Sequence, residues 1–194
     1  MENKKYKLTK ETKVRFDGVV LHRIQRTDKT RELGGFIFSE KNLSQNGNAW
    51  VSGDAEVYGN AEVSGNAWVS GNAWVSGNAE VYGNAEVYGN AEVSGNAWVS
   101  GNAWVSGDAE VSGDAWVFGN AEVSGNAEVF GNAWVSGDAE VSGNAWVYGD
   151  AWVYGDAEVF GRFNVTTKIS VELPRITIDT PEKVVKLKEF LDRF

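Results

Sequence analysis

The stretch from Gly47 to Phe160, which begins GNAWVSGDAEVYGNAEVS, consists of nineteen consecutive hexads without an insertion. Glycine stands first in every hexad, Asn or Asp second, Ala third and Val fifth. The fourth place holds only Trp or Glu, and the sixth holds Ser, Tyr or Phe. A fixed period of this kind is the sequence signature of an architecture in which repeated units stack.

Each hexad has the local chemistry of one short strand and one bend. The four-residue alternation after the Asn or Asp points Ala and Val to one side and the two variable residues to the other. The Gly-Asn or Gly-Asp pair tolerates left-handed backbone angles and predicts a turn. Such a strand buries little alone, so coiling is expected to stack equivalent strands in parallel, ~4.8 Å apart. An antiparallel meander is disfavoured, because nineteen identical short strands would form one very long flat sheet.

The repeat resembles the hexapeptide-repeat proteins of the left-handed parallel β-helix fold, which carry Val and Ala inside and Asn or Asp at the corner. The resemblance implies three hexads per coil and left-handed winding, an exception to the usual right-handed crossover. It predicts an all-β fold, a left-handed parallel β-helix of about six triangular coils. Residues 33–44 (LGGFIFSEKNLS) also resemble the lead-in of uncharacterised hexapeptide-repeat proteins of bacteria and their phages.

Three regions are expected along the chain: a β-rich N-terminal cap at 1–46, the repeat at 47–161 and a C-terminal cap at 162–194. In the first region Asp17-Gly18 predicts a hairpin turn between two strands. The last region begins with strand-like alternation. Thr180-Pro181 then predicts the start of an amphipathic helix, with Thr as the N-cap and Pro at the first helical position.

Charge is divided between these regions. The repeat carries ten Glu, six Asp and no Lys or Arg, whereas residues 1–46 have a net charge of +5 and residues 161–194 of +2. Without a basic stripe the repeat is not expected to bind nucleic acid directly, and its acidity suits a basic partner or simply solubility. No apolar run is long enough for a membrane span or a signal peptide, and there is no cysteine. The expectation is therefore a cytoplasmic protein with no membrane contact.

The features that an enzyme of this resemblance would need are missing. The resemblance implies that acyltransferases use a histidine as general base, and related carbonic anhydrases use three histidines on a metal. The only histidine is His22, in the expected cap. We therefore predict no catalytic residue, no cofactor and no metal site. An acyltransferase-like enzyme remains the minority alternative.

Three hexads per coil would stack residues eighteen apart on one of three faces. The fourth-place residues of the first face are then Trp50, Trp68, Glu86, Trp104, Glu122, Glu140 and Glu158. Those of the second face are Glu56, Trp74, Glu92, Glu110, Glu128 and Trp146. Those of the third face are Glu62, Glu80, Trp98, Trp116, Trp134 and Trp152.

The third face carries the leading binding candidates. Trp98, Trp116, Trp134 and Trp152 form a ladder of four, with Phe118 and Tyr154 in the neighbouring row. One Trp can bury ~150–250 Å², so four could exceed the ~300–600 Å² of a typical largest apolar patch. The ladder is interpreted as a partner- or ligand-binding surface, as a stack that stabilises neighbouring strands, or as both.

Two rows of glutamate form the acidic candidates, Glu92, Glu110 and Glu128 on the second face and Glu122, Glu140 and Glu158 on the first. Like charges on adjacent strands destabilise a sheet. These rows would then serve a basic protein partner or bound cations. Alternatively, the side chains splay apart and solvent screens them.

The leading functional hypothesis is a non-catalytic binding protein that engages a basic host protein or self-associates, with a homotrimer favoured. The phage-like lead-in suggests a decoy that acts against host defence. One alternative is sequestration of a nucleotide or glycan, with Arg23, Arg26, Lys29 and Arg31 as candidate phosphate contacts. Another is a structural spacer whose length is set by the number of hexads.

Overall fold

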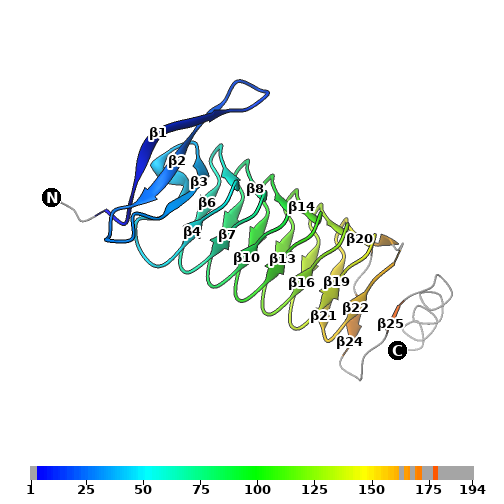
Figure 1. Cartoon of the computed structure of the whole chain (residues 1–194). Helices are drawn as coiled ribbons and strands as arrows, with labels where there is room; N and C mark the ends of the chain where they lie inside the picture. The colour runs from blue at the N-terminus through cyan, green and yellow to red at the C-terminus, as the bar shows by residue number, and fades with distance from the viewer. Residues whose placement is uncertain (1–3, 162–163, 167–168, 172–176, 179–194) are drawn as a thin grey trace, which may run out of the picture.

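The computed structural model describes residues 4–161, 164–166, 169–171 and 177–178. These residues form a parallel β-solenoid of about seven turns with three sheets along its axis. Figure 1 shows the coils stacked from the cyan N-terminal end to the orange C-terminal end, with β1 (Tyr6–Val14) and β2 (Val20–Arg26) at the N-terminal end. The predicted all-β solenoid is confirmed.

The first face is an eight-stranded parallel sheet. Its strands are β4 (Trp50–Val51), β7 (Trp68–Val69), β10 (Glu86–Val87), β13 (Trp104–Val105), β16 (Glu122–Val123), β19 (Glu140–Val141), β22 (Glu158–Val159) and β25 (Thr177–Ile178). The third face has seven strands: β6 (Glu62–Val63), β9 (Glu80–Val81), β12 (Trp98–Val99), β15 (Trp116–Val117), β18 (Trp134–Val135), β21 (Trp152–Gly155) and β24 (Ile169–Val171).

The second face is a ten-stranded sheet, because β1 and β2 extend it antiparallel at the N-terminal end. Its parallel strands are β3 (Leu33–Ile37), β5 (Glu56–Val57), β8 (Trp74–Val75), β11 (Glu92–Val93), β14 (Glu110–Val111), β17 (Glu128–Val129), β20 (Trp146–Val147) and β23 (Asn164–Val165). Within the repeat, paired residues are eighteen apart, as in Trp98 with Trp116. Three hexads per coil and the predicted membership of each face are therefore confirmed.

Backbone hydrogen bonds and a narrow apolar interior hold the coils together. Trp98 N donates to Ala115 O and Ser100 N to Val117 O, both at 2.9 Å, and the same pattern recurs on every face. Every Ala at the third place and every Val at the fifth is buried. Small and β-branched side chains suit this position, because they pack between closely spaced rungs.

The corners carry a second ladder made of asparagine amides. Each bond runs from Nδ2 of one Asn to Oδ1 of the residue eighteen positions later, as from Asn60 to Asn78 at 3.0 Å and from Asn78 to Asn96 at 2.9 Å. Aspartate can only accept at this place. Asp114 accepts from Asn96 at 2.8 Å, and its carboxylate has no hydrogen to pass on to the next corner.

Residues 4–46 are called here the lead-in. Its last part, from β3 onward, builds the first coil of the solenoid, although it lacks the hexad pattern. β3 pairs parallel with β5, Leu43 forms a parallel bridge to Val63, and β4 completes the turn. The 3₁₀ turn η1 (Glu40–Asn42) places the Asn42 amide so that Nδ2 donates to Ala61 O at 2.8 Å. The coil count exceeds the expected six because such irregular segments add rungs at both ends.

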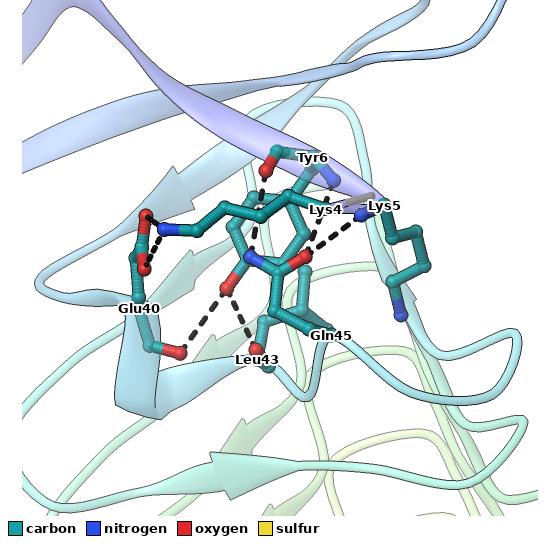
Figure 2. A network of polar contacts seen from close by, with 6 residues as sticks. All are labelled: Lys4, Lys5, Tyr6, Glu40, Leu43 and Gln45. Carbon is teal, nitrogen blue, oxygen red and sulfur yellow. Dashed lines mark hydrogen bonds and ion pairs between the residues drawn. The ribbon is translucent and has the colours of Figure 1, made fainter. Parts of the chain in front are cut away.

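A polar network ties the first strand to this coil (Figure 2). The Tyr6 hydroxyl donates to Leu43 O at 2.7 Å, and Gln45 Oε1 accepts from Lys5 N at 2.9 Å. Lys4 Nζ pairs with the Glu40 carboxylate at 2.7 Å. Burial and the charge of Glu40 raise the pKa of Tyr6, so the hydroxyl stays protonated and remains a donor.

The predicted hairpin is confirmed. Its first strand, β1, runs from Tyr6 to Val14 with a register shift between Leu8 and Thr12. The turn at Gly18 follows it. The strands predicted after the repeat are β23, β24 and β25. The predicted helix from Thr180 lies outside the described residues.

Candidate binding surface

Four tryptophans of the third face form a continuous stack, as the sequence predicts. Ring centroids lie 4.6 Å apart for Trp98 and Trp116, and 5.0 Å apart for Trp116 with Trp134 and Trp134 with Trp152. The interplanar angles are 14°, 7° and 7°. Trp98, Trp116 and Trp134 are half-buried, because neighbouring rings cover one another, whereas Trp152 is 39 % exposed. Trp152, at the C-terminal end, is therefore the most exposed ring of the stack.

A groove of about 310 Å³ lies at that end of the stack. It is lined by Phe118, Trp134, Ser136, Trp152 and Tyr154. Phe118 meets Trp134 edge-to-face with 6.1 Å between centroids. The structure thus brings four of the six predicted third-face residues into one lining.

Ser136 gives the groove its shape. Phe118, Ser136 and Tyr154 are eighteen residues apart and occupy successive rungs of one row. In the equivalent row of the second face, Phe130 and Tyr148 are on adjacent rungs and stack with 5.0 Å between centroids and 4° between planes. At Ser136 a ring is replaced by a hydroxyl, which leaves one ring-sized place between two aromatic residues.

The predicted acidic rows form in register. Glu92 is paired with Glu110 and Glu110 with Glu128 on the second face, and Glu122, Glu140 and Glu158 follow one another on the first. Burial and the charge of Glu110 raise the pKa of Glu92, and Arg15 opposes that shift. In the described part of the chain, no group of three or more His, Cys, Asp or Glu side chains could hold a metal ion.

The four candidate phosphate contacts do not share one role. Arg23 pairs with Glu11 at 3.1 Å and Arg26 with Glu32 at 2.9 Å. Lys29 and Arg31 are exposed in the connection between β2 and β3. His22 lies in β2, opposite Ile37 of β3.

The lead-in covers two outward side chains that the repeat pattern alone places on the surface. Trp50 is fully buried beneath Arg26, whose Cζ lies 4.2 Å from the ring centroid, and beside Tyr6 at 6.4 Å. Glu56 is buried against Arg15 of the hairpin turn. The surface available for binding therefore begins beyond these two residues.

Arg15 makes a contact that sequence reasoning missed. Its guanidinium pairs with Glu56 and lies over two rings, 3.9 Å from the Tyr58 centroid and 4.8 Å from that of Trp74. Once the coil length is known, one sequence signal marks the places where a sixth-place aromatic residue lies beside a Trp, as Tyr58 does beside Trp74. The sixth-place aromatics Tyr58, Tyr82, Tyr88, Phe118 and Phe130 are each followed sixteen residues later by Trp, whereas no sixth-place aromatic is followed at that spacing by Glu.

The structure gives the reason for this spacing. Residue i+16 sits on the next rung, so the sixth-place ring meets the edge or face of the Trp beside it. Centroids are 6.1 Å apart for Tyr82 with Trp98 and 6.5 Å for Tyr88 with Trp104. Aromatic pairs favour such edge-to-face geometry.

Comparison with known proteins gives one family match. Residues 61–77, 91–107 and 139–155 match the model of the YdcK beta solenoid repeat. All three segments contain one Glu hexad followed by two Trp hexads. No curated protein matches the chain. Among the described residues, no helix has the length and apolar character needed to cross a bilayer. The fold and the matched segments together identify the chain as a repeat β-solenoid protein.

Proposed function

We propose that this protein is a non-catalytic binding protein whose rigid solenoid presents the aromatic third face to a protein partner. The observation that carries the proposal is the groove formed by Phe118, Trp134, Ser136, Trp152 and Tyr154 at the end of the Trp stack. Trp and Tyr dominate the energetically important positions of protein interfaces. Here stacking holds the Trp134 and Trp152 rings in place, which lowers the entropy that binding would otherwise cost.

Self-association through the same face is part of this proposal. The resemblance to hexapeptide-repeat proteins of the left-handed β-helix fold favours a homotrimer, in which third faces or C-terminal regions meet. Light scattering after size-exclusion chromatography tests it: a trimer is expected, and a monomer at all concentrations contradicts self-association. The phage-like lead-in and the acidic repeat further support a role as a phage-encoded decoy for a basic host protein.

Capture of a partner from the native host tests the binding function. The double variant Trp152→Ser, Tyr154→Ser removes two walls of the groove, and we expect it to lose partners that the unchanged protein retains. Trp68→Ser is the matched control, because Trp68 is exposed on the first face and lies outside the groove. Equal capture by all three proteins contradicts a binding role for the groove.

A second candidate function is binding of one uncharged nucleobase or sugar ring, which the ring-sized place at Ser136 favours. The ring of a nucleobase or sugar would lie between Phe118 and Tyr154, with the Ser136 hydroxyl below it. Ser136→Phe should fill this place as Phe130 does beside Tyr148. Calorimetric titration with a nucleoside and glycan panel should then detect binding to the unchanged protein and none to the Ser136→Phe variant. Absence of binding to the unchanged protein contradicts this candidate.

A further inference from the structure

Arg15 occupies a constellation of three side chains that recurs along the solenoid. The constellation, called here the Glu–aromatic–Trp triad, has Glu at one position, an aromatic residue two positions later and Trp eighteen positions after the Glu. In the occupied triad these are Glu56, Tyr58 and Trp74. Glu56 is paired in register with Trp74, and the guanidinium of Arg15 contacts all three.

Three further triads follow the same spacing. They are Glu80, Tyr82 and Trp98 on the third face, Glu86, Tyr88 and Trp104 on the first, and Glu128, Phe130 and Trp146 on the second. In each, the Glu and the Trp are register partners on adjacent strands. In each, the aromatic ring lies edge-to-face with its Trp, at 6.1 to 6.5 Å.

We propose that the three remaining triads bind arginine side chains of a protein partner, as the first triad binds Arg15. The proposal rests on the proposed binding function and names the chemistry of the partner, an arginine-rich segment. A guanidinium is planar and weakly hydrated, so it stacks on aromatic rings and bonds a carboxylate at the same time. The ammonium of lysine forms the ion pair but cannot stack as a plane.

Charge and placement support the same occupant. Residues 47–160 contain sixteen acidic side chains and no Lys or Arg, so no cation of the repeat itself competes for these triads. Two triads begin on β9 and β10, which are consecutive strands of one coil on either side of the Gly83-Asn84 corner. One arginine-rich segment that crosses this corner can reach both. Linked contacts of this kind raise the overall affinity above that of either alone.

Calorimetric titration of the full chain with a nonapeptide of arginine tests the proposal, and a lysine nonapeptide of equal charge is the control ligand. We expect at least fivefold tighter binding of the arginine peptide. The triple variant Tyr82→Ser, Tyr88→Ser, Phe130→Ser keeps the net charge and introduces the residue that most hexads carry. It should lose at least tenfold in affinity for arginine while lysine binding changes less than twofold.

A matched pair of single variants separates triad binding from loss of any aromatic side chain. Trp68 and Trp104 are both 46 % exposed on the first face, and both are register partners of Glu86. Only Trp104 belongs to a triad. Trp104→Ser should weaken arginine-peptide binding about threefold and Trp68→Ser should not, which keeps the test available if the triple variant does not fold.

Equal affinity for the two peptides, or equal effects of Trp68→Ser and Trp104→Ser, overturns the proposal. Failure of both peptides to bind overturns it as well. Partner capture with the Trp152→Ser, Tyr154→Ser variant tests the proposed function separately, because Trp152 and Tyr154 belong to none of the triads. Loss of captured partners with the groove variant but not with the triad variant leaves the binding function standing without arginine recognition.

Discussion

Arg15 and Glu56 form an ion pair in which the two side chains are only 4 % and 3 % exposed. Burial by itself lowers the pKa of Arg15, but the hydrogen bond and the charge of Glu56 raise it, and the net direction is upward. Lys13 Nζ adds a second contact to the same carboxylate at 2.7 Å. The pair joins the hairpin turn to the outer surface of β5, so the position of the hairpin depends on it.

Removing one partner of this pair should destabilise the protein strongly. Glu56→Gln removes the buried partner of the Arg15 guanidinium and leaves it only the partly exposed Asp17 carboxylate, 3.6 Å from Nε. Breaking a buried pair costs about 3–5 kcal/mol, and the low end is expected here. Urea unfolding measures the change in the free energy of unfolding. Glu11→Gln is the control, because the Glu11–Arg23 pair is partly exposed and should contribute less than about 1 kcal/mol. Similar losses in both variants contradict this account.

Stacking in the Trp ladder should be measurable as a coupling energy. A double-mutant cycle with Trp98→Ser and Trp116→Ser isolates the contact at 4.6 Å, and we expect about 0.5–1.5 kcal/mol. Trp68 and Trp104 are separated by the Glu86 rung, so their cycle should give a coupling near zero. Equal coupling in the two cycles would mean that the ladder does not stabilise the rungs.

The corner ladder predicts opposite effects of two reciprocal substitutions. Asp114→Asn supplies an Nδ2 donor for Asn132, and one net hydrogen bond contributes about 0.5–1.5 kcal/mol, with the low end expected at an exposed corner. Asn96→Asp removes the bond to Asp114 and places two carboxylates on adjacent rungs. The midpoint temperature of thermal unfolding should therefore rise for Asp114→Asn and fall for Asn96→Asp. Shifts of the same sign contradict the ladder account.

Glycine at the corners is required by contact as well as by backbone angle. A Cβ on Gly77 would lie 2.7 Å from Gly95 O and 2.9 Å from Gly95 N, and its φ is +68°. Gly18 in the hairpin has φ +83° and open space around a built Cβ. Gly18→Ala should then lower the free energy of unfolding only by the left-handed strain of about 1–2 kcal/mol. Gly77→Ala should lower it by more, because the added Cβ also clashes with the backbone of Gly95. If urea unfolding shows that both variants lose the same free energy of unfolding, the next rung shifts to accommodate the added Cβ and this account is contradicted.

Stability should depend on pH through Glu92. Its pKa is raised in the folded protein by burial and by Glu110, so the folded state binds the proton more readily than the unfolded chain. The stability from this group is present below the unfolded pKa and is lost as pH rises through the folded pKa. Glu92→Gln should therefore be more stable than the unchanged protein at pH 7, and this advantage should shrink as the pH falls through the raised folded pKa of Glu92 and vanish below its unfolded pKa. Glu62→Gln, at an exposed site, is the control; an equal pH-dependent gain there contradicts the role of burial.

Much of the fold follows from the hexad alone. Ala49 and Val51 face inward because alternation in a strand points every second side chain to the same side, and every later hexad repeats this geometry. The stacking of Trp98 on Trp116 follows as soon as three hexads close one coil. The sixteen-residue link between Tyr88 and Trp104 is equally present in the sequence, but it becomes meaningful only when the rung offset is known.

The hexad could not reveal which outward residues the lead-in covers. Trp50 and Trp68 occupy the same place in the repeat, yet one is fully buried and the other exposed. The sequence by itself determined the short strand, the glycine corner and the inward-facing Ala and Val, because those depend on local backbone geometry repeated at a fixed interval. The closure of three hexads into one coil, and with it the three faces, followed from the resemblance to hexapeptide-repeat proteins. Only the tertiary structure decided that Arg15 reaches Glu56, Tyr58 and Trp74, because that contact depends on how an irregular segment folds back over distant rungs.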